Sequence, residues 1–159
     1  MLRPRNIEGA KAPLFDRLTD FDPKSQTESR PFRTLNRAEL RASVLRELGR
    51  LLNTRCSVPM QLLYDRERSI IDYGIPSFSH LVPQSGDDQK RLAWVLSRTI
   101  AAFEPRLKEI RVAVTPDPTN ARFLLVQVEA YLAVGAVTEP VSFPAVIHPK
   151  TGEVRLLDG

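Results

Sequence analysis

The residue types best suited to chemistry meet in the tetrad Phe103-Glu104-Pro105-Arg106, where an acid and an arginine flank a proline. Because the residue before a proline avoids the helical region of backbone space, this proline marks the end of a helix. We expect the stiff turn to hold both charges outward, so that Arg106 can bind a partner's carboxylate through two hydrogen bonds. An Arg106→Ala change would then weaken assembly and leave the fold intact. The alternative is that both are solvated residues at a helix end, where ion pairs contribute little.

Catalytic arrangements are hard to build from the remaining residues. His80 and His148 are the only histidines, each near a proline in an expected loop, and neither has metal-ligand spacing to another residue. The sequence contains no nucleophile elbow, phosphate-binding loop or dinucleotide fingerprint. A peptidoglycan glycosidase would need two carboxyl groups across one bond, which Glu104 could form with one of three acids: Asp65, Glu67 or Asp72. Spacing selects none of these pairs, so we predict a protein that is not an enzyme and holds no cofactor or metal, with the glycosidase as the alternative.

Two amphipathic helices must position the tetrad. The first begins at Asn36 or Thr34, with a glutamate at capping-box spacing after Asn36, and its apolar residues recur at helical spacing through 40–52. The second begins after Ser85, which is followed by two aspartates that suit the positive end of the helix dipole. Its apolar stripe runs through 92–103 and leads directly into the tetrad.

The last third of the chain predicts a sheet. Apolar and polar residues alternate in three segments, at 110–114, 124–132 and 141–145, and a turn at 149–152 leads into a last strand at 154–157. Two prolines at the third segment limit its ladder donors and suggest an edge or a bulge. Between the helices, residues 61–64 and 69–73 could be short extended segments. Helices followed by consecutive strands indicate an α+β fold, with two main helices packed on a mostly antiparallel sheet and an extended N-terminal arm.

Residues 1–36 are expected to form that arm and residues 37–159 a single domain. The arm contains an apolar island that includes Leu14, Phe15 and Leu18, which we expect to order on a partner; a merely mobile terminus is the alternative. Residues 1–37 hold eight basic and five acidic residues, so +3 of the net charge of +4 lies there. The nearly neutral remainder argues against nucleic acid as a partner, since nucleic-acid binding requires a concentrated basic face, although docking of the basic arm is an alternative.

Composition also limits the cellular setting. Cys56 is the only cysteine, so neither an intrachain disulfide nor a cysteine-based zinc cluster can form. No apolar run approaches the roughly 18 residues of a membrane-spanning helix, and the first residues lack the apolar core of a signal peptide. We therefore expect a cytoplasmic protein that does not insert into a membrane.

Residues 14–19, the helix end Leu51-Leu52-Asn53-Thr54-Arg55 and residues 69–78, with their tyrosine-glycine-aliphatic-proline turn, follow one another along the chain. In this order they resemble the start and the central segment of the TssE family of type VI secretion baseplate proteins. Residues 103–107 match the glutamate-proline-arginine motif of the wider family, which includes a phage baseplate wedge protein and is also called lysozyme-like. Residues 141–143 and 151–153 fit the closing strands.

The resemblance implies a structural subunit of a cytoplasmic baseplate docked at the inner membrane. Its implied partners are the wedge proteins TssF and TssG and the contractile sheath subunits, with the spike hub and TssK as further candidates. The family's closing β region resembles the part of sheath subunits that shares strands between neighbours, which agrees with an edge strand near the C-terminus. By the same resemblance, Glu104, Pro105 and Arg106 become partner-binding candidates. Enzymatic activity is not carried over, because the residues assemble no supported acid and nucleophile.

Overall fold

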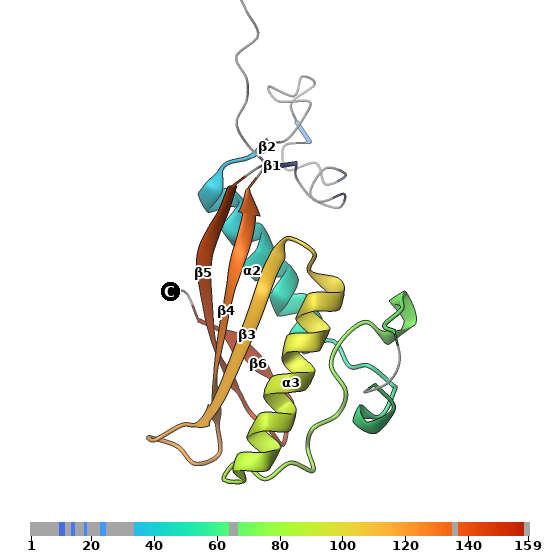
Figure 1. Cartoon of the computed structure of the whole chain (residues 1–159), viewed down its shortest axis with the longest axis vertical. Helices are drawn as coiled ribbons and strands as arrows, with labels where there is room; N and C mark the ends of the chain where they lie inside the picture. The colour runs from blue at the N-terminus through green and yellow to red at the C-terminus, as the bar shows by residue number, and fades with distance from the viewer. Residues whose placement is uncertain are drawn as a thin grey trace, which may run out of the picture.

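Strands and helices follow one another along the chain largely as the sequence predicts. The computed structural model describes residues 10–11, 14, 18, 23–24, 34–63, 67–134 and 137–157. Their elements are β1 (Ala10–Lys11), β2 (Thr34–Leu35), α2 (Arg37–Asn53), the 3-10 helices η1 (Met60–Leu63) and η2 (Ile70–Asp72), α3 (Gly86–Phe103), β3 (Leu107–Pro116), β4 (Leu124–Val134), β5 (Val137–Ile147) and β6 (Val154–Leu156). Strands β3, β4, β5 and β6 form one antiparallel sheet in that order (Figure 1). The predicted α+β class is confirmed.

Local side-chain chemistry sets where both long helices begin. The Asn36 side chain accepts a hydrogen bond from the Glu39 N–H at 2.9 Å, and the Glu39 carboxylate accepts one from the Asn36 N–H at 2.8 Å. This reciprocal capping box satisfies two backbone donors that a helix start leaves without partners. At α3, the Ser85 hydroxyl accepts from the Asp88 N–H at 3.3 Å. Both predicted caps are confirmed, and Thr34 lies in β2 instead.

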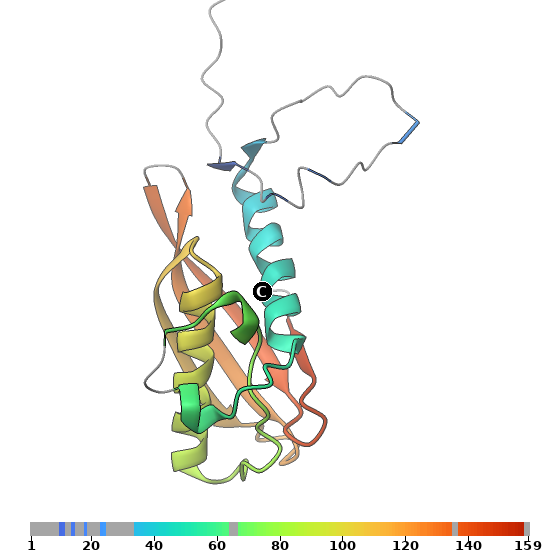
Figure 2. The same ribbon diagram turned by 90° about the vertical axis from the view of Figure 1, so that its right-hand side faces the viewer.

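One face of the sheet is covered by the helices, which lie in front of the strands in Figure 2. Alternate strand residues point into this interface, and the stripes of α2 and α3 meet them there, as their helical spacing predicts. The largest fully buried side chains come from both helices, the segment between them and the sheet: Leu40, Leu48, Leu51, Leu52, Ile75, Phe78, Leu92, Leu96, Ile100, Leu124, Leu132 and Phe143. A single core therefore joins α2, η1, α3 and the strands β3, β4, β5 and β6.

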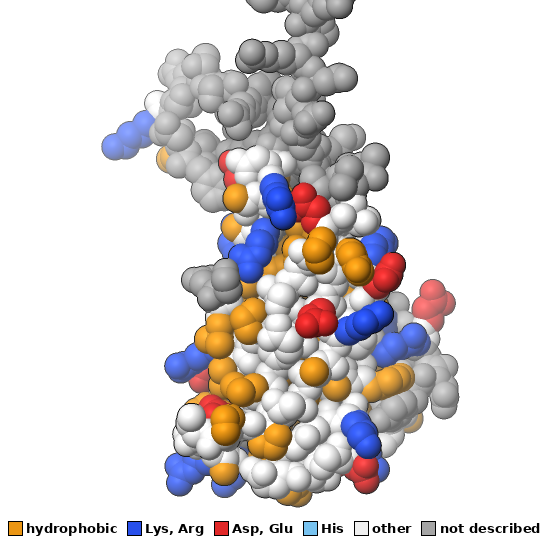
Figure 3. Space-filling model, turned by 60° about the vertical axis from the view of Figure 1, so that its left-hand side comes forward, with side chains coloured by type: hydrophobic (Ala, Val, Ile, Leu, Met, Phe, Trp, Pro, Cys, Tyr) orange, Lys and Arg blue, Asp and Glu red, His pale blue; other side chains and the backbone are white. Residues whose placement is uncertain are grey.

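The opposite face of the sheet carries no helix among the described residues. Its cross-strand neighbours include an opposite-charge pair, Arg111 with Glu129, and an apolar pair, Leu125 with Val146. Figure 3 looks mostly onto this side, and basic and acidic side chains are interspersed there with scattered apolar ones. None of the described helices is long and apolar enough to cross a membrane.

The segment between the helices differs from the expectation of short extended pieces. Residues 60–63 and 70–72 form the 3-10 helices η1 and η2. At η2 the buried Asp72 carboxylate accepts from the Ser69 N–H at 2.9 Å and from the Ser69 hydroxyl at 3.1 Å. These local side-chain bonds compete with an extended backbone, which is why the β-branched Ile70 and Ile71 do not form a strand.

The N-terminal region contributes one small element to this fold. β1 pairs antiparallel with β2, so Ala10 lies opposite Leu35 immediately before α2. Leu14 and Leu18 of the predicted apolar island are exposed, at 64% and 71% of their surface, whereas Phe15 lies outside the described residues. The domain boundary at residue 36 and the ordering of the arm on a partner remain predictions.

A β-bulge interrupts β3 close to its beginning. The register between β3 and β4 shifts between Lys108 and Arg111, and Glu109 has a φ of 50°. This left-handed conformation is uncommon for residues other than glycine and costs on the order of 1 kcal/mol. The bulge turns β3 out of the sharp turn that follows α3 and increases the local twist.

Replacing Glu109 with glycine tests this strain. Glycine adopts the left-handed conformation freely, and the Glu109 side chain is exposed, so we expect Glu109→Gly to raise the free energy of unfolding by roughly 0.5–1 kcal/mol in urea denaturation. Arg111→Gly, two residues further along the strand, is the control and should instead lower it by a similar amount. Destabilisation by both changes would show that Glu109 carries no strain.

Candidate functional site

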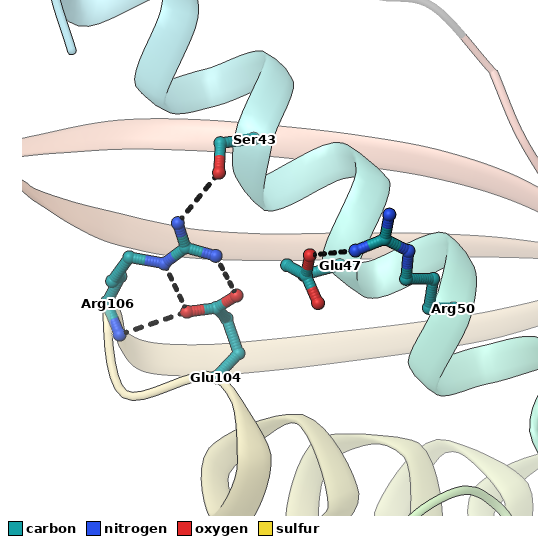
Figure 4. Close-up of polar contacts among 5 residues, drawn as sticks. All are labelled: Ser43, Glu47, Arg50, Glu104 and Arg106. Carbon is teal, nitrogen blue, oxygen red and sulfur yellow. Dashed lines mark hydrogen bonds and ion pairs between the residues drawn. The ribbon is translucent and has the colours of Figure 1, made fainter. Parts of the chain in front are cut away.

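A buried ion pair occupies the turn between α3 and β3 (Figure 4). Glu104 is the C-cap residue of α3, and its side chain is only 4% exposed. Its two carboxylate oxygens accept from Arg106 Nε at 2.6 Å and from Arg106 Nη2 at 2.5 Å. The remaining nitrogen, Nη1, donates to the Ser43 hydroxyl on α2 at 3.1 Å. Ser43, Glu104 and Arg106, here called the Glu104 cluster, thus connect α2 to the turn that begins the sheet.

This geometry corrects the expectation that the turn holds both charges outward. The carboxylate of Glu104 lies inside the protein, and Arg106 grips that carboxylate instead of one on a partner. The Arg106 backbone is also fixed, because its carbonyl accepts from the Ala133 N–H on β4 at 2.9 Å. Pro105 between them is exposed, so it is the part of the motif that a partner would meet first. The alternative prediction, that Glu104 is a solvated residue at a helix end, is also wrong, because its side chain is buried.

A polar edge of α2 continues from the Glu104 cluster. One turn beyond Ser43, Glu47 pairs with Arg50 at 2.6 Å (Figure 4). The nearby Tyr73 packs edge-on against Phe103, with ring centroids 5.2 Å apart. Burial raises the pKa of the Tyr73 phenol, and the negative charges of Glu47 and Glu104 raise it further, whereas the positive charge of Arg50 lowers it. The phenol therefore stays neutral at the junction of both helices.

The described carboxylates among those considered for a glycosidase do not assemble into a catalytic pair. Both oxygens of Glu104 are engaged by Arg106, so neither is free to protonate a leaving group. Asp72 is fully buried and accepts from Ser69 to hold η2. Glu67 is exposed, and Asp65 lies outside the described residues. The geometry thus offers no support for this alternative.

The histidines have separate surroundings. His80 is exposed. His148 accepts from the Thr151 N–H at 3.2 Å and packs edge-on against Phe123, so it shapes the turn before β6. Within the described ranges, no three His, Cys, Asp or Glu side chains come together in a way that could hold a metal ion.

Three other segments of the family resemblance, at residues 51–55, 69–78 and 151–153, meet at a second junction, at the end of α2. The Asn53 side chain donates to the Val154 carbonyl at 2.8 Å and accepts from the Val154 N–H at 3.0 Å, so it pairs with β6 as a strand would. Arg55 donates to the Gly152 carbonyl and lies over the Phe78 ring, 5.0 Å from its centroid. Burial lowers the pKa of Arg55. Segments far apart in sequence are therefore held together by the end of one helix.

The tyrosine-glycine turn closes this junction from the other side. The Ile75 N–H donates to the Thr54 carbonyl at 3.0 Å, and the Ile75 carbonyl accepts from the Cys56 N–H at 3.0 Å. Gly74 has a φ of 104°, and a Cβ at this position would overlap the Thr54 carbonyl. Only glycine combines this backbone conformation with such a close approach.

The sheet has two edges. The direction of the backbone groups along the β3 edge follows from one hydrogen bond. The Asp117 N–H donates to the Phe123 carbonyl at 3.1 Å, in register with the β3–β4 ladder. Backbone direction alternates along an antiparallel strand, so Arg111, Ala113 and Thr115 point their amides at β4. Val112 and Val114 consequently point theirs away from the sheet. No strand pairs with this side of β3 in the part of the chain that the structure describes.

The opposite edge is closed to a further strand. β6 pairs with residues 145–147, and the Leu157 N–H donates to the Pro144 carbonyl at 2.8 Å, so among the described residues β5 is unpaired on that side before Pro144. Pro140 and Pro144 occupy positions that face this edge and have no N–H to donate. Between them, the Ser142 carbonyl accepts from Arg41 at 3.4 Å. The edge predicted near the C-terminus therefore exists, but β3 presents the better donors.

Sequence reasoning missed three contributors to these sites. Ser43 has no sequence signal beyond a small residue on the buried stripe of α2, and the sequence indicates for Tyr73 only a short extended segment and a turn. Asn53 was read as the end of a helix, although it is a side chain that can imitate a backbone pair. Each becomes identifiable only when a second element is placed beside it.

The Glu104 cluster predicts a stability effect where the outward geometry predicted none. Arg106→Ala would leave a buried carboxylate without its partner, which costs on the order of 3 kcal/mol. The double change Glu104→Gln/Arg106→Met removes both charges and keeps most of the volume, so we expect it to cost less than the single change. Urea denaturation followed by circular dichroism measures both. If Arg106→Ala is as stable as the wild type, the pair does not hold the turn.

Gly74→Ala tests the second junction. The left-handed φ and the approach to the Thr54 carbonyl should together cost roughly 2 kcal/mol or more, measured as a lower free energy of unfolding. Gly86→Ala is the control, because a Cβ on Gly86 at the start of α3 meets open space. We expect that control to be neutral or slightly stabilising, since alanine favours helix. Equal effects of the two changes would contradict the assigned geometry.

One family of known proteins matches more than half of this chain. The sequence profile of the family described as baseplate wedge protein gp25 matches residues 38–136. A solved chain from a structure described as the baseplate complex from the type VI secretion system is similar, with a TM-score of 0.48 and 17% identity, over 77% of this chain and 97% of that one. No curated protein matches the sequence. The matched residues run from the start of α2 to the β4–β5 hairpin and include the Glu104 cluster, so the chain belongs to the baseplate wedge protein gp25 family.

Proposed function

We propose that this chain is a TssE-like structural subunit of a type VI secretion baseplate, which links the wedge proteins to the base of the contractile sheath. Family membership supports the baseplate role. The ordered motifs of the sequence support the type VI assignment within the family. On this proposal the protein is cytoplasmic, assembles with TssF, TssG and sheath subunits, and performs no catalysis.

The observation that carries this proposal is the free edge of β3. The strand runs for ten residues, Leu107–Pro116, and from Val112 onward its outward amides are directed away from the sheet. The Ser97 hydroxyl on α3 donates to the Ile110 carbonyl at 3.4 Å, so the open stretch begins beyond that residue. An unprotected edge of this kind templates pairing with a strand of another chain. We propose that a sheath subunit adds a strand there and that the subunit thereby starts sheath assembly.

The partner-binding residues of the sequence prediction take a narrower place in this proposal. Pro105 is the exposed member of its motif, and Glu104 and Arg106 act by holding that proline and the start of β3 in position. Leu14 and Leu18 are exposed apolar side chains on the N-terminal arm, available to a wedge protein. The same contact is proposed for Phe15, which lies outside the described residues.

Removing one donor from the β3 edge tests the proposed strand addition. Val112→Pro deletes an outward N–H without touching the β3–β4 ladder, so it should abolish co-sedimentation with assembled sheath while co-purification with TssF and TssG persists. Val112→Ala loses similar apolar atoms but keeps the N–H, and should retain sheath binding. Ser142→Pro places a further proline on the closed edge and should also retain it.

Thermal melts establish that each of these variants is folded before binding is compared. If a folded Val112→Pro variant still binds the sheath, the sheath does not add a strand at the β3 edge. A wild-type chain that binds neither TssF–TssG nor sheath would contradict the baseplate assignment to the type VI system as a whole.

A further inference from the structure

Two adjacent isoleucines project from η2 into solvent. Ile70 is 86% exposed and Ile71 is 76% exposed, the highest values among the large apolar side chains that the structure describes. Single exposed apolar residues are ordinary on protein surfaces, but adjacent large aliphatic side chains at this exposure are typical of an interaction site. The core does not use them, and neither the Glu104 cluster nor the β3 edge includes them.

Buried polar groups hold this turn in one conformation. Asp72 and Thr99 are both fully buried. Asp72 accepts from Ser69, and Arg68 donates to the Asp72 carbonyl at 3.2 Å and to the Thr99 hydroxyl on α3 at 3.0 Å. Burying a carboxylate is costly unless hydrogen bonds satisfy it, so this arrangement fixes the turn at some expense. Its result is a preorganised pair of apolar side chains, which would lose little conformational freedom on binding.

A groove of about 330 Å³ lies next to the turn, between α3 and the segment that leads into η2. Its walls are Leu63, Ala101 and Ala102, and its charged residues are Glu67, Arg68 and Arg98. Arg68 is engaged by the turn itself. Arg98 is exposed and lies over the Trp94 ring, 5.8 Å from its centroid, but has no carboxylate partner among the residues described. The groove therefore offers one guanidinium without a carboxylate partner among the described residues, next in sequence to the Thr99 that Arg68 binds.

We propose that Ile70 and Ile71 insert into an apolar groove of a wedge protein and that an acidic residue at the rim of that groove pairs with Arg98. Apolar anchors in a desolvated centre with an arginine at its border form a common arrangement at protein interfaces. This inference rests on the proposed baseplate function and assigns the wedge contact to η2 and α3, on a surface separate from the β3 edge.

Binding to the purified TssF–TssG complex from the same source tests this surface. We expect Ile70→Ser/Ile71→Ser to weaken the complex by at least about 30-fold, since buried interface anchors contribute on the order of 2 kcal/mol. Val82→Ser is the control, because Val82 is also exposed, at 56%, but belongs neither to η2 nor to the lining of the groove. Arg98→Glu should weaken binding about tenfold or more, whereas Arg122→Glu, a charge reversal in the β3–β4 turn, should not.

All changed side chains are exposed, so the variants should melt as the wild type does. If the wild type binds TssF–TssG and the isoleucine and Arg98 variants bind as tightly, the proposed contact surface is wrong and the baseplate function still stands. Absence of any wild-type complex would instead refute the proposed function and this inference with it. A wild-type dimer that the isoleucine changes convert to a monomer would show that a second copy of the chain occupies the surface, which also overturns the proposal.

Discussion

The ion pair between Glu104 and Arg106 is the constraint on which the arrangement of the molecule depends. It closes the turn where α3 ends and β3 begins, and through Ser43 it attaches that turn to α2. Because it is shielded from water and made through two parallel hydrogen bonds, its geometry is specific, and loss of one partner would strand a buried charge. The order of the motif follows: proline stops the helix, and the flanking charges fold back on each other.

The sheet has one covered face and two unequal edges, and this asymmetry suits a subunit of a larger assembly. On the β5 side, two prolines and an arginine side chain occupy the edge, whereas on the β3 side the amides of Val112 and Val114 point away from the sheet. Proteins commonly protect exposed edges against unwanted pairing. Protection of one edge alone would give the proposed strand addition a single direction. The isoleucines of η2 lie on a different element, so two partners could bind at once.

The features that could be predicted from the sequence are those set by residues close to one another along the chain. Both long helices, their caps at Asn36 and Ser85, and the alternation of β4 follow from local hydrogen bonding and periodicity. The segment around Asp72 was misread because β-branched residues resemble a strand, while a single carboxylate bonded to Ser69 imposes a 3-10 turn. The sequence predicts a stiff charged turn at residues 104–106, and the structure places a buried ion pair there, with the Glu104 carboxylate directed inward instead of outward. Pro105 predicts a rigid turn, but the sequence of the turn does not show whether protein or solvent surrounds the flanking side chains.

The fold class, the order of the elements and membership of the wedge family follow from the amino-acid sequence alone, because they depend on periodicity, caps and short motifs that neighbouring residues carry. The three-dimensional arrangement is needed to see that Glu104 is buried, that Asn53 and Arg55 hold the end of α2 against β6 and its preceding turn, and which strand edge stays open. The physical reason is that burial and pairing depend on what lies opposite a residue in space. For Arg106 and Ser43, 63 positions apart, that neighbour appears only when the core brings α2 and the α3–β3 turn together.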